Sequence, residues 1–227
     1  MEYYVPVETT VVTEYVYKAD QYLEHRSKDD KFKEQVFTAM KKLEGWCSEE
    51  KASVLIDLIK EKQPQTIVEI GVFGGKSLVP MAFALQRNGF GAIYGVDPWT
   101  EVASEKGMEG AHKDWWGSIN HNKILNDLQD RIIEFGLEHT IELLRYTSID
   151  CPEIYDIDIL HIDGNHSEEA SYIDVTKWVP LVKSGGVIIF DDLDWVSTGK
   201  AIAWLDENCV KVQEFKGSNI WAIWVKP

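Results

Sequence analysis

Three carboxylates stand at the ends of two apolar runs of the sequence, where they could hold a metal ion. Asp163 follows the run Ile157 to Ile162, and Asp191 and Asp192 follow the run Val187 to Phe190. Carboxylates brought together without a counter-charge repel one another, and their oxygens suit a hard divalent cation such as Mg²⁺. The sequence therefore predicts a metal site of these three acids. The alternative interpretation is a loop before a helix and a solvated turn.

A glycine-rich turn follows the run Thr66 to Ile70 and could hold a nucleotide-like ligand. The turn is rich in small residues, namely Gly71, Gly74, Gly75 and Ser77. Glycines let the backbone turn sharply and approach a ligand, and the helix predicted to follow offers free N–H groups. A phosphate-binding loop would need a glycine in place of Ile70, and a dinucleotide fingerprint would need one in place of Phe73. Neither of these loops fits.

Asp97 ends the next apolar run, Ala92 to Val96. Its distance from Gly71 is close to the offset of about 20 residues at which an acid binds ribose hydroxyls in a βαβ unit. An ionised carboxylate only accepts hydrogen bonds, so it pairs with two vicinal hydroxyl donors. We therefore expect an adenosine-bearing cofactor. Trp99 is predicted to pack near the adenine, with a core aromatic as the equal alternative.

Short apolar runs that alternate with helical stretches predict a mostly parallel α/β sheet with helices on both faces. The expected strands are Thr66 to Ile70, Ala92 to Val96, Thr140 to Leu144, Ile157 to Ile162, Val187 to Phe190, Val210 to Phe215 and Ile220 to Val225. The expected helices between them are Leu78 to Asn88, Ile119 to Phe135, Glu168 to Val182 and Gly199 to Glu207. The connection between the last two strands is too short for a helical crossover, so these strands should form an antiparallel hairpin.

The regions outside this pattern are predicted separately. Residues 1–63 are expected to form an N-terminal helical extension, a candidate lid or oligomer contact, and residues 64–227 the cofactor-binding domain. Ser48 and Pro64 mark the ends of the second helix of the extension. Residues 1–30 show no clear period and could be a lid, an arm or a tail. Residues 99–118 are expected to be a loop-rich insertion over one end of the sheet.

From about Thr66 to Pro227 the chain resembles the class I S-adenosylmethionine-dependent methyltransferases. The resemblance rests on Val68-Glu69-Ile70-Gly71, Gly75, Ser77 and Gly95-Val96-Asp97. It implies a Rossmann-like sheet of seven strands with an antiparallel last strand. It also implies that the turn contacts the methionine part of the cofactor and that Asp97 binds the ribose. The predicted cofactor contacts are Glu69, Gly71, Gly75, Ser77, Asp97, Trp99, Ser148 and Asp163.

The acids resemble those of the magnesium-dependent, catechol-type O-methyltransferases, whose metal ligands match Asp163, Asp191 and Asp192. Those enzymes place a lysine as general base three residues after the first acid, and here that position is His166. A neutral imidazole is available near pH 7, so His166 is the predicted catalytic base, with a polar residue before the next helix as the equal alternative. A broad group of bacterial methyltransferases shares the Asp-Gly-x-His-Ser motif. Asp194 and Trp195 are expected to line the acceptor pocket.

The resemblance and the acids together predict metal-assisted O-methylation of a small hydroxylated acceptor, such as a sugar, polyol or phenol. Transfer to nitrogen or carbon without a metal, or a non-catalytic cofactor-binding module, are the alternatives. The net charge of −15 argues against nucleic acid and anionic membranes as partners. Three cysteines without a paired spacing, an acidic start and the lack of a long apolar run favour a cytoplasmic protein.

Overall fold

A seven-stranded sheet forms the centre of the computed structural model, which describes residues 30–217 and 219–227. The strand order is β3-β2-β1-β4-β5-β7-β6. The strands are β1 (Thr66–Ile70), β2 (Ala92–Val96), β3 (Ile141–Leu144), β4 (Ile157–Ile162), β5 (Val182–Phe190), β6 (Val210–Lys216) and β7 (Ile220–Val225). The lid, arm or tail predicted over residues 1–30 lies outside the described residues, apart from Asp30.

The pairing of the strands confirms the predicted topology. Strands β1 to β5 pair in parallel, and β7 pairs antiparallel with both β5 and β6. Helices connect β1 to β2, β2 to β3 and β4 to β5, and they supply the crossovers that parallel pairing requires, whereas β3 runs to β4 without a helix. The carboxyl ends of β1, β2 and β4 therefore meet at one edge of the sheet, which is where ligands bind in such folds.

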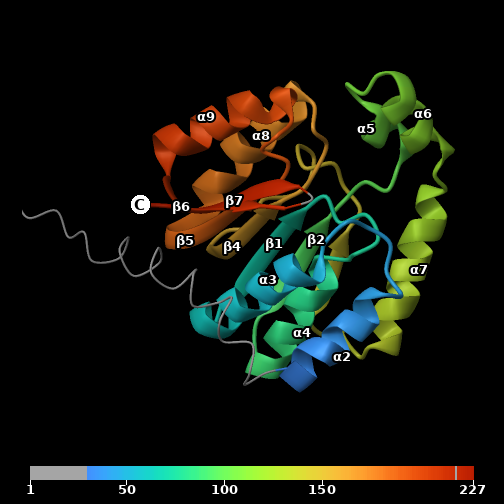
Figure 1. The fold of residues 1–227 in the computed structure, drawn as a ribbon, viewed down its shortest axis with the longest axis vertical. Helices are drawn as coiled ribbons and strands as arrows, with labels where there is room; N and C mark the ends of the chain where they lie inside the picture. The colour runs from blue at the N-terminus through green and yellow to red at the C-terminus, as the bar shows by residue number, and fades with distance from the viewer. Residues whose placement is uncertain (1–29, 218) are drawn as a thin grey trace, which may run out of the picture.

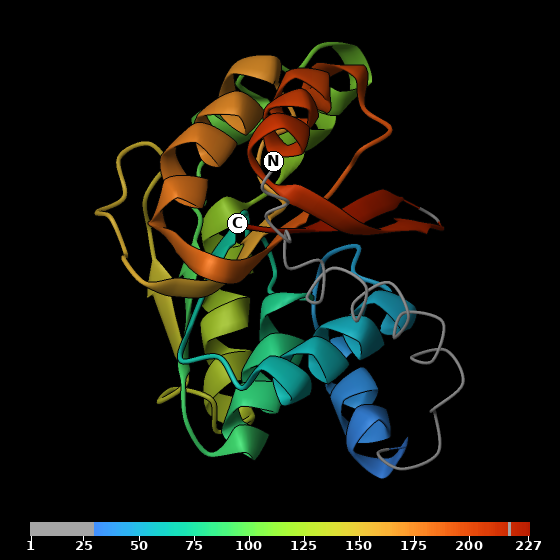
Figure 2. The same cartoon turned by 90° about the vertical axis from the view of Figure 1, so that its left-hand side faces the viewer.

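Helices cover both faces of this sheet (Figures 1 and 2). On one face lie α2 (Asp30–Met40), α3 (Glu49–Lys62), α4 (Leu78–Asn88) and α7 (His121–Glu134), and on the other α8 (Glu168–Trp178) and α9 (Gly199–Asn208). Each face has its own hydrophobic core, because alternate residues of a strand point to opposite faces. Ile67 packs with the first group of helices, and its neighbour Val68 packs with the second. Among the described residues, none of the helices has the length and apolar character to cross a membrane.

The helix α3 begins and ends where the sequence predicts. The Ser48 side chain accepts a hydrogen bond from the backbone N–H of Lys51 at 3.1 Å, so it caps the helix N-terminus. Gln63 adopts a left-handed conformation just before Pro64. Residues of α2 and α3 share a hydrophobic core with α4 and β1. The helical character of the described part of the extension is thus present, while the domain boundary near residue 63 stays a prediction.

Two predicted boundaries are wrong by more than two residues. The helix expected over Glu168 to Val182 ends at Trp178, and a 3-10 turn over Val179–Leu181 follows, because Pro180 has no N–H to continue the helix. Strand β5 consequently starts at Val182 rather than Val187, with an irregularity opposite Ile157 and Ile159 that absorbs the extra residues.

The insertion expected to be loop-rich contains two helices, α5 (Glu101–Glu105) and α6 (Gly110–Ser118). The Thr100 side chain accepts from the backbone N–H of Ala103 and starts α5. The glycines of the insertion suggested a loop, but Gly107 only separates the two helices, and Gly117 lies within α6. Both helices lie beyond the strand ends, above α7 in Figure 1.

Candidate functional site

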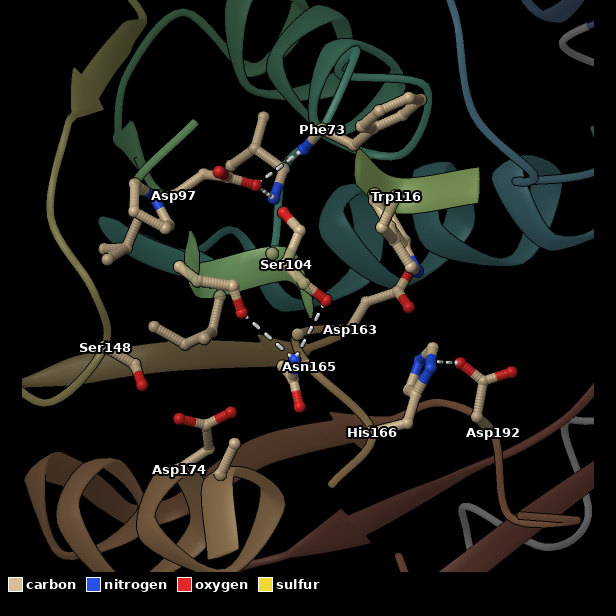
Figure 3. Close-up of a pocket in the computed structure, with 18 of the residues that line it drawn as sticks. Phe73, Asp97, Ser104, Trp116, Ser148, Asp163, Asn165, His166, Asp174 and Asp192 are labelled. Carbon is tan, nitrogen blue, oxygen red and sulfur yellow. Dashed lines mark hydrogen bonds and ion pairs between the residues drawn. The ribbon is translucent and has the colours of Figure 1, made fainter. Parts of the chain in front are cut away.

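A cavity of about 790 Å³ opens at the carboxyl ends of the strands. Such a volume falls in the range of about 300 to 1,000 Å³ that holds small ligands and cofactors. Its walls come from the glycine-rich turn, the ends of β2 and β4, the insertion helices and the segment before α3. Figure 3 shows Asp97 and Phe73 on one side of it and Asp163, His166 and Asp192 on another.

Gly71 joins the ends of three strands at the base of the cavity. Its N–H donates to the Val96 carbonyl at 2.9 Å, and the Asp163 N–H donates to the carbonyl of the preceding Ile70 at 2.8 Å. Gly71 has a φ of +85°, and a Cβ placed on it would lie 2.0 Å from the Asp163 carbonyl oxygen. Only glycine therefore allows this backbone conformation and this close approach.

Asp97 fixes the turn through its carboxylate. Oδ2 accepts from the N–H groups of Val72 at 3.1 Å and Phe73 at 2.9 Å, and Oδ1 accepts from Trp99 at 2.7 Å. Burial raises the pKa of this carboxyl, although the three backbone donors work in the opposite direction. An ionised carboxylate has about four acceptor positions, so Asp97 retains capacity for a hydroxyl donor on its cavity side.

Five of the predicted cofactor contacts line the cavity, namely Gly71, Ser77, Asp97, Ser148 and Asp163. Three do not. Glu69 is fully buried and accepts a hydrogen bond from the Ser77 hydroxyl, since its strand position turns it into the protein. Gly75 packs against Leu128 of α7. Trp99 is 1% exposed in the core, where its indole N–H donates to the Phe73 carbonyl at 2.8 Å.

The two cavity-facing acids lie beside His166. Carboxylate oxygens of Asp163 and Asp192 and a ring nitrogen of His166 all lie within 4.8 Å of one another. His166 Nε2 is 2.6 Å from Asp192 Oδ2. Burial, and next the charge of Asp191, raise the pKa of Asp163 to about 8 against the opposing charge of Lys51. This end of the cavity thus gathers two acids around one imidazole.

Burial favours the neutral form of the His166 imidazole. The neighbouring Asp192 carboxylate, with Asp163 and Asp191, outweighs burial and raises the His166 pKa above its ordinary value. With Nε2 beside Asp192, Nδ1 is the ring nitrogen left to accept a proton. The ring also packs on Trp195, with the two ring centroids 4.6 Å apart.

Asp191 does not line the cavity, although one of its carboxylate oxygens lies within 4.8 Å of ligand atoms of Asp163 and His161, so the predicted three-acid metal set stays a prediction. Its side chain is buried, and Oδ2 pairs with the ammonium group of Lys51 and with His161 Nε2, the latter at 2.7 Å. The acid pair after β5 is therefore divided. Asp192 faces the cavity, and Asp191 faces the interior because successive side chains at the strand end point in opposite directions.

Aromatic side chains cover the outer part of the cavity. Trp46, Phe73, Trp115 and Trp116 form one cluster, in which Trp46 stacks on Phe73 at 5.3 Å and Trp115 meets Trp116 at 4.8 Å between ring centroids. Trp46 is 63% exposed and Trp115 is 45% exposed, although all four line the cavity. Trp195 lines the cavity as predicted, whereas Asp194 is exposed outside it.

Asn165 ties the insertion to the end of β4. Its side-chain amide donates to the carbonyl oxygens of Lys106 at 2.9 Å and Ala103 at 3.2 Å. It also lies 3.4 Å from the Ser104 carbonyl oxygen (Figure 3). The insertion is thereby held over the acids and His166, which places Trp115 and Trp116 on the same cavity.

The sequence reasoning missed Lys51, Trp46 and Asp174, which also line the cavity. A signal for Lys51 was present, because it shares one helical face with Leu55 and Leu58, and a charged residue on an apolar face needs a partner. Asp174 is buried on α8, its Oδ1 has no hydrogen-bond partner, and burial raises its pKa to about 7. No comparable signal in the sequence marks Trp46 or Asp174.

Comparisons with known proteins agree with this geometry. A family model described as a methyltransferase domain matches residues 68–193, which is more than half of the chain. Among solved structures, the chain is similar to an O-methyltransferase from Bacillus cereus in complex with S-adenosylhomocysteine, with 16% identity, 95% of this chain and 100% of that chain covered, and a TM-score of 0.60.

Two further solved structures share the fold. The O-methyltransferase TomG from Streptomyces achromogenes, in complex with S-adenosylmethionine, is 18% identical over 80% of this chain and 82% of that chain, with a TM-score of 0.57. The S-adenosylhomocysteine-bound methyltransferase PaMTH1 from Podospora anserina is 13% identical over 100% of both chains, with a TM-score of 0.58. The family match and the fold together show that this chain belongs to the class I S-adenosylmethionine-dependent methyltransferases.

Proposed function

We propose that this enzyme transfers a methyl group to the oxygen of a small hydroxylated acceptor, such as a sugar, polyol or phenol, with help from a divalent cation. The observation that carries the proposal is the pairing of His166 with Asp192 beside Asp163 at the inner end of the cavity. A hydroxyl needs a base to take its proton, and an imidazole held by a carboxylate is suited to that role.

The cofactor is expected in the half of the cavity formed by Gly71, Asp97 and Ser148. Asp97 fixes the turn through the amides of Val72, Phe73 and Trp99 and retains acceptor capacity for a ribose hydroxyl. S-adenosylmethionine, when bound there, supplies an electrophilic methyl group on its sulfonium. Its methionine end would lie toward Asp163, which occupies the border between the two halves of the site.

The acceptor is expected between His166 and the aromatic cluster of Trp46, Phe73, Trp115 and Trp116. The hydroxyl oxygen forms the new bond to the methyl carbon as the carbon–sulfur bond breaks, and His166 Nδ1 takes the hydroxyl proton. Asp192 stabilises the resulting imidazolium, as its effect on the His166 pKa indicates. The aromatic side chains exclude water and pack on the apolar part of the acceptor.

The side chains at this end of the cavity fit a divalent cation. Asp163 and Asp192 offer oxygen ligands, and Mg²⁺ commonly binds through one or two carboxylates while its other positions take water or substrate. A bound cation supplies Lewis acidity, which lowers the pKa of a nearby hydroxyl. The metal ligands that we propose are thus Asp163 and Asp192, while Asp191 pairs with Lys51.

Removing divalent cations tests this part of the proposal. Chelation should abolish acceptor turnover and Mg²⁺ should restore it, while binding of S-adenosylhomocysteine, followed by calorimetry, continues without the metal. Asp163→Asn and Asp192→Asn should each lower kcat by about a hundredfold or more, because charge stabilisation by a metal contributes several kcal/mol.

Asp194→Asn is the matched control, because Asp194 stands in the same loop but is exposed outside the cavity. It should leave kcat near that of the wild type. Turnover that survives chelation unchanged would reject the metal and favour metal-independent transfer to nitrogen or carbon. Failure to bind S-adenosylhomocysteine would reject the whole proposal.

Two further properties belong to the proposal. We place the enzyme in the cytoplasm, since Cys47, Cys151 and Cys209 are free thiols. We also expect no nucleic-acid or membrane partner, because the net charge of −15 disfavours polyanionic surfaces. The N-terminal extension remains our candidate for a lid or an oligomer contact.

A further inference from the structure

A buried chain of polar side chains runs behind the cavity and begins at Lys51 of the N-terminal helix α3. The Lys51 ammonium contacts Asp191 Oδ2 at the end of β5 and lies 3.1 Å from His161 Nε2 on β4. His161 Nδ1 lies 2.9 Å from Glu69 Oε1 on β1, and that oxygen accepts from the Ser77 hydroxyl at the start of α4. The chain therefore links α3 to the loop after β5 and to the glycine-rich turn.

The members of this chain are closed off from solvent. Lys51 is 4% exposed, Asp191 is 2% exposed, and both His161 and Glu69 are 0% exposed. Lys51 also lies over the Trp221 ring, 5.4 Å from its centroid. A charge at such depth is costly to bury without a partner, so the ammonium and the Asp191 carboxylate depend on each other.

The two acids after β5 have different partners. Asp191 pairs with Lys51 in the interior, and the next residue, Asp192, contacts His166 on the cavity side. Asp192 has a φ of +56°, an unusual conformation for a non-glycine residue that its surroundings must maintain. The position of Asp192, and with it that of His166, thus depends on a residue of α3.

We propose that Lys51 is a positioning residue for methyl transfer, which holds the Asp191–Asp192 turn so that Asp192 and His166 meet in the cavity. The inference rests on the proposed function. Lys51 lies outside the residues matched by the methyltransferase family model, 68–193. The N-terminal extension therefore contributes a side chain that helps to position residues of the site.

The test compares Lys51→Met, which removes the charge at similar length, with Lys51→Arg, which keeps it. Lys33→Met is the matched control, because the Lys33 ammonium also pairs with an acid of α3, Asp57, at 2.6 Å. Neither residue of this pair lines the cavity. We expect Lys51→Met to lower kcat by about ten- to a hundredfold, as for a catalytic group displaced by about 1 Å. Affinity for S-adenosylhomocysteine should change less than kcat, and Lys51→Arg should recover part of the loss.

Lys33→Met should keep the kcat of the wild type even if it unfolds more easily. All rates are compared at a temperature at which circular dichroism shows each variant folded. The proposal is overturned if Lys51→Met turns over like the wild type, if its loss is entirely one of cofactor affinity, or if Lys33→Met loses as much.

A second measurement is independent of catalysis and separates this inference from the proposed function. Lys51→Met leaves the buried Asp191 carboxylate with His161 as its remaining partner, whereas Lys51→Met with Asp191→Asn removes both charges. The double variant should therefore unfold at a higher urea concentration than Lys51→Met alone. Equal midpoints would show that Lys51 does not compensate Asp191 and would overturn the proposal, whether or not the enzyme methylates oxygen.

Discussion

His166→Ala is expected to reduce kcat by about a hundredfold to ten-thousandfold, the range that a positioned general base contributes. The reason is that His166 Nδ1 would take the acceptor proton while Nε2 lies 2.6 Å from Asp192. S-adenosylhomocysteine should bind the variant like the wild type, because the cofactor half of the cavity is formed by other residues. Steady-state kinetics and calorimetry on the same preparation measure both quantities.

The dependence of kcat on pH tests this prediction independently. Since the acids around His166 raise its pKa, the neutral base forms only at higher pH than for a free imidazole. In the wild type kcat should therefore rise with pH as the His166 imidazole loses its proton, and the variant should lack this limb. His139→Ala, at an exposed histidine, is the control and should behave like the wild type. Unchanged kcat in His166→Ala would remove this residue from the mechanism.

Gly71→Ala should damage both folding and cofactor binding. The new Cβ would lie 2.0 Å from the Asp163 carbonyl oxygen, which cannot move without disturbing the backbone contact between β1 and β4. Overpacking costs about 1 to 3 kcal/mol and a left-handed conformation about 1 to 2 kcal/mol more. We expect a loss of about 2 to 5 kcal/mol in the free energy of unfolding and a large loss of affinity for S-adenosylhomocysteine.

Gly89→Ala separates the backbone strain from the steric clash. Gly89 has a φ of +83°, close to the +85° of Gly71, but a Cβ there meets nothing within 4 Å. It should cost only the strain, about 1 to 2 kcal/mol, and leave cofactor binding intact. Urea unfolding measures the free energy of unfolding, and calorimetry measures the affinity for S-adenosylhomocysteine. Equal effects of the two substitutions would contradict the close backbone contact between Gly71 and Asp163.

The sheet could be predicted because its signals are local. Strands β1, β2, β4 and β7 begin and end at the predicted residues, since each is a short apolar run bounded by turn residues. The start of β5 was missed because Pro180 divides what looked like one long helix. The two helices of the insertion were missed because its glycines resemble those of a loop, although one of them lies inside α6.

The candidate site was predicted best where strand order alone brings residues together. Gly71, Asp97, Asp163 and Asp192 end neighbouring strands, and they line the cavity. No local pattern encodes the contact of Asp191 with Lys51, which is 140 residues away in the chain. The burial of Trp99 likewise depends on a hydrogen bond to Phe73 across the turn.

The central claim is that a hydroxyl oxygen receives the methyl group beside His166. The most direct measurement is transfer from S-adenosylmethionine labelled with ¹³C in the methyl group to a panel of sugars, polyols and phenols, with matched amines. The chemical shift of the labelled carbon identifies the atom to which it is bound. We predict O-methyl products that disappear in His166→Ala. Label found only on nitrogen or carbon, or O-methyl products that persist in His166→Ala, would contradict the claim.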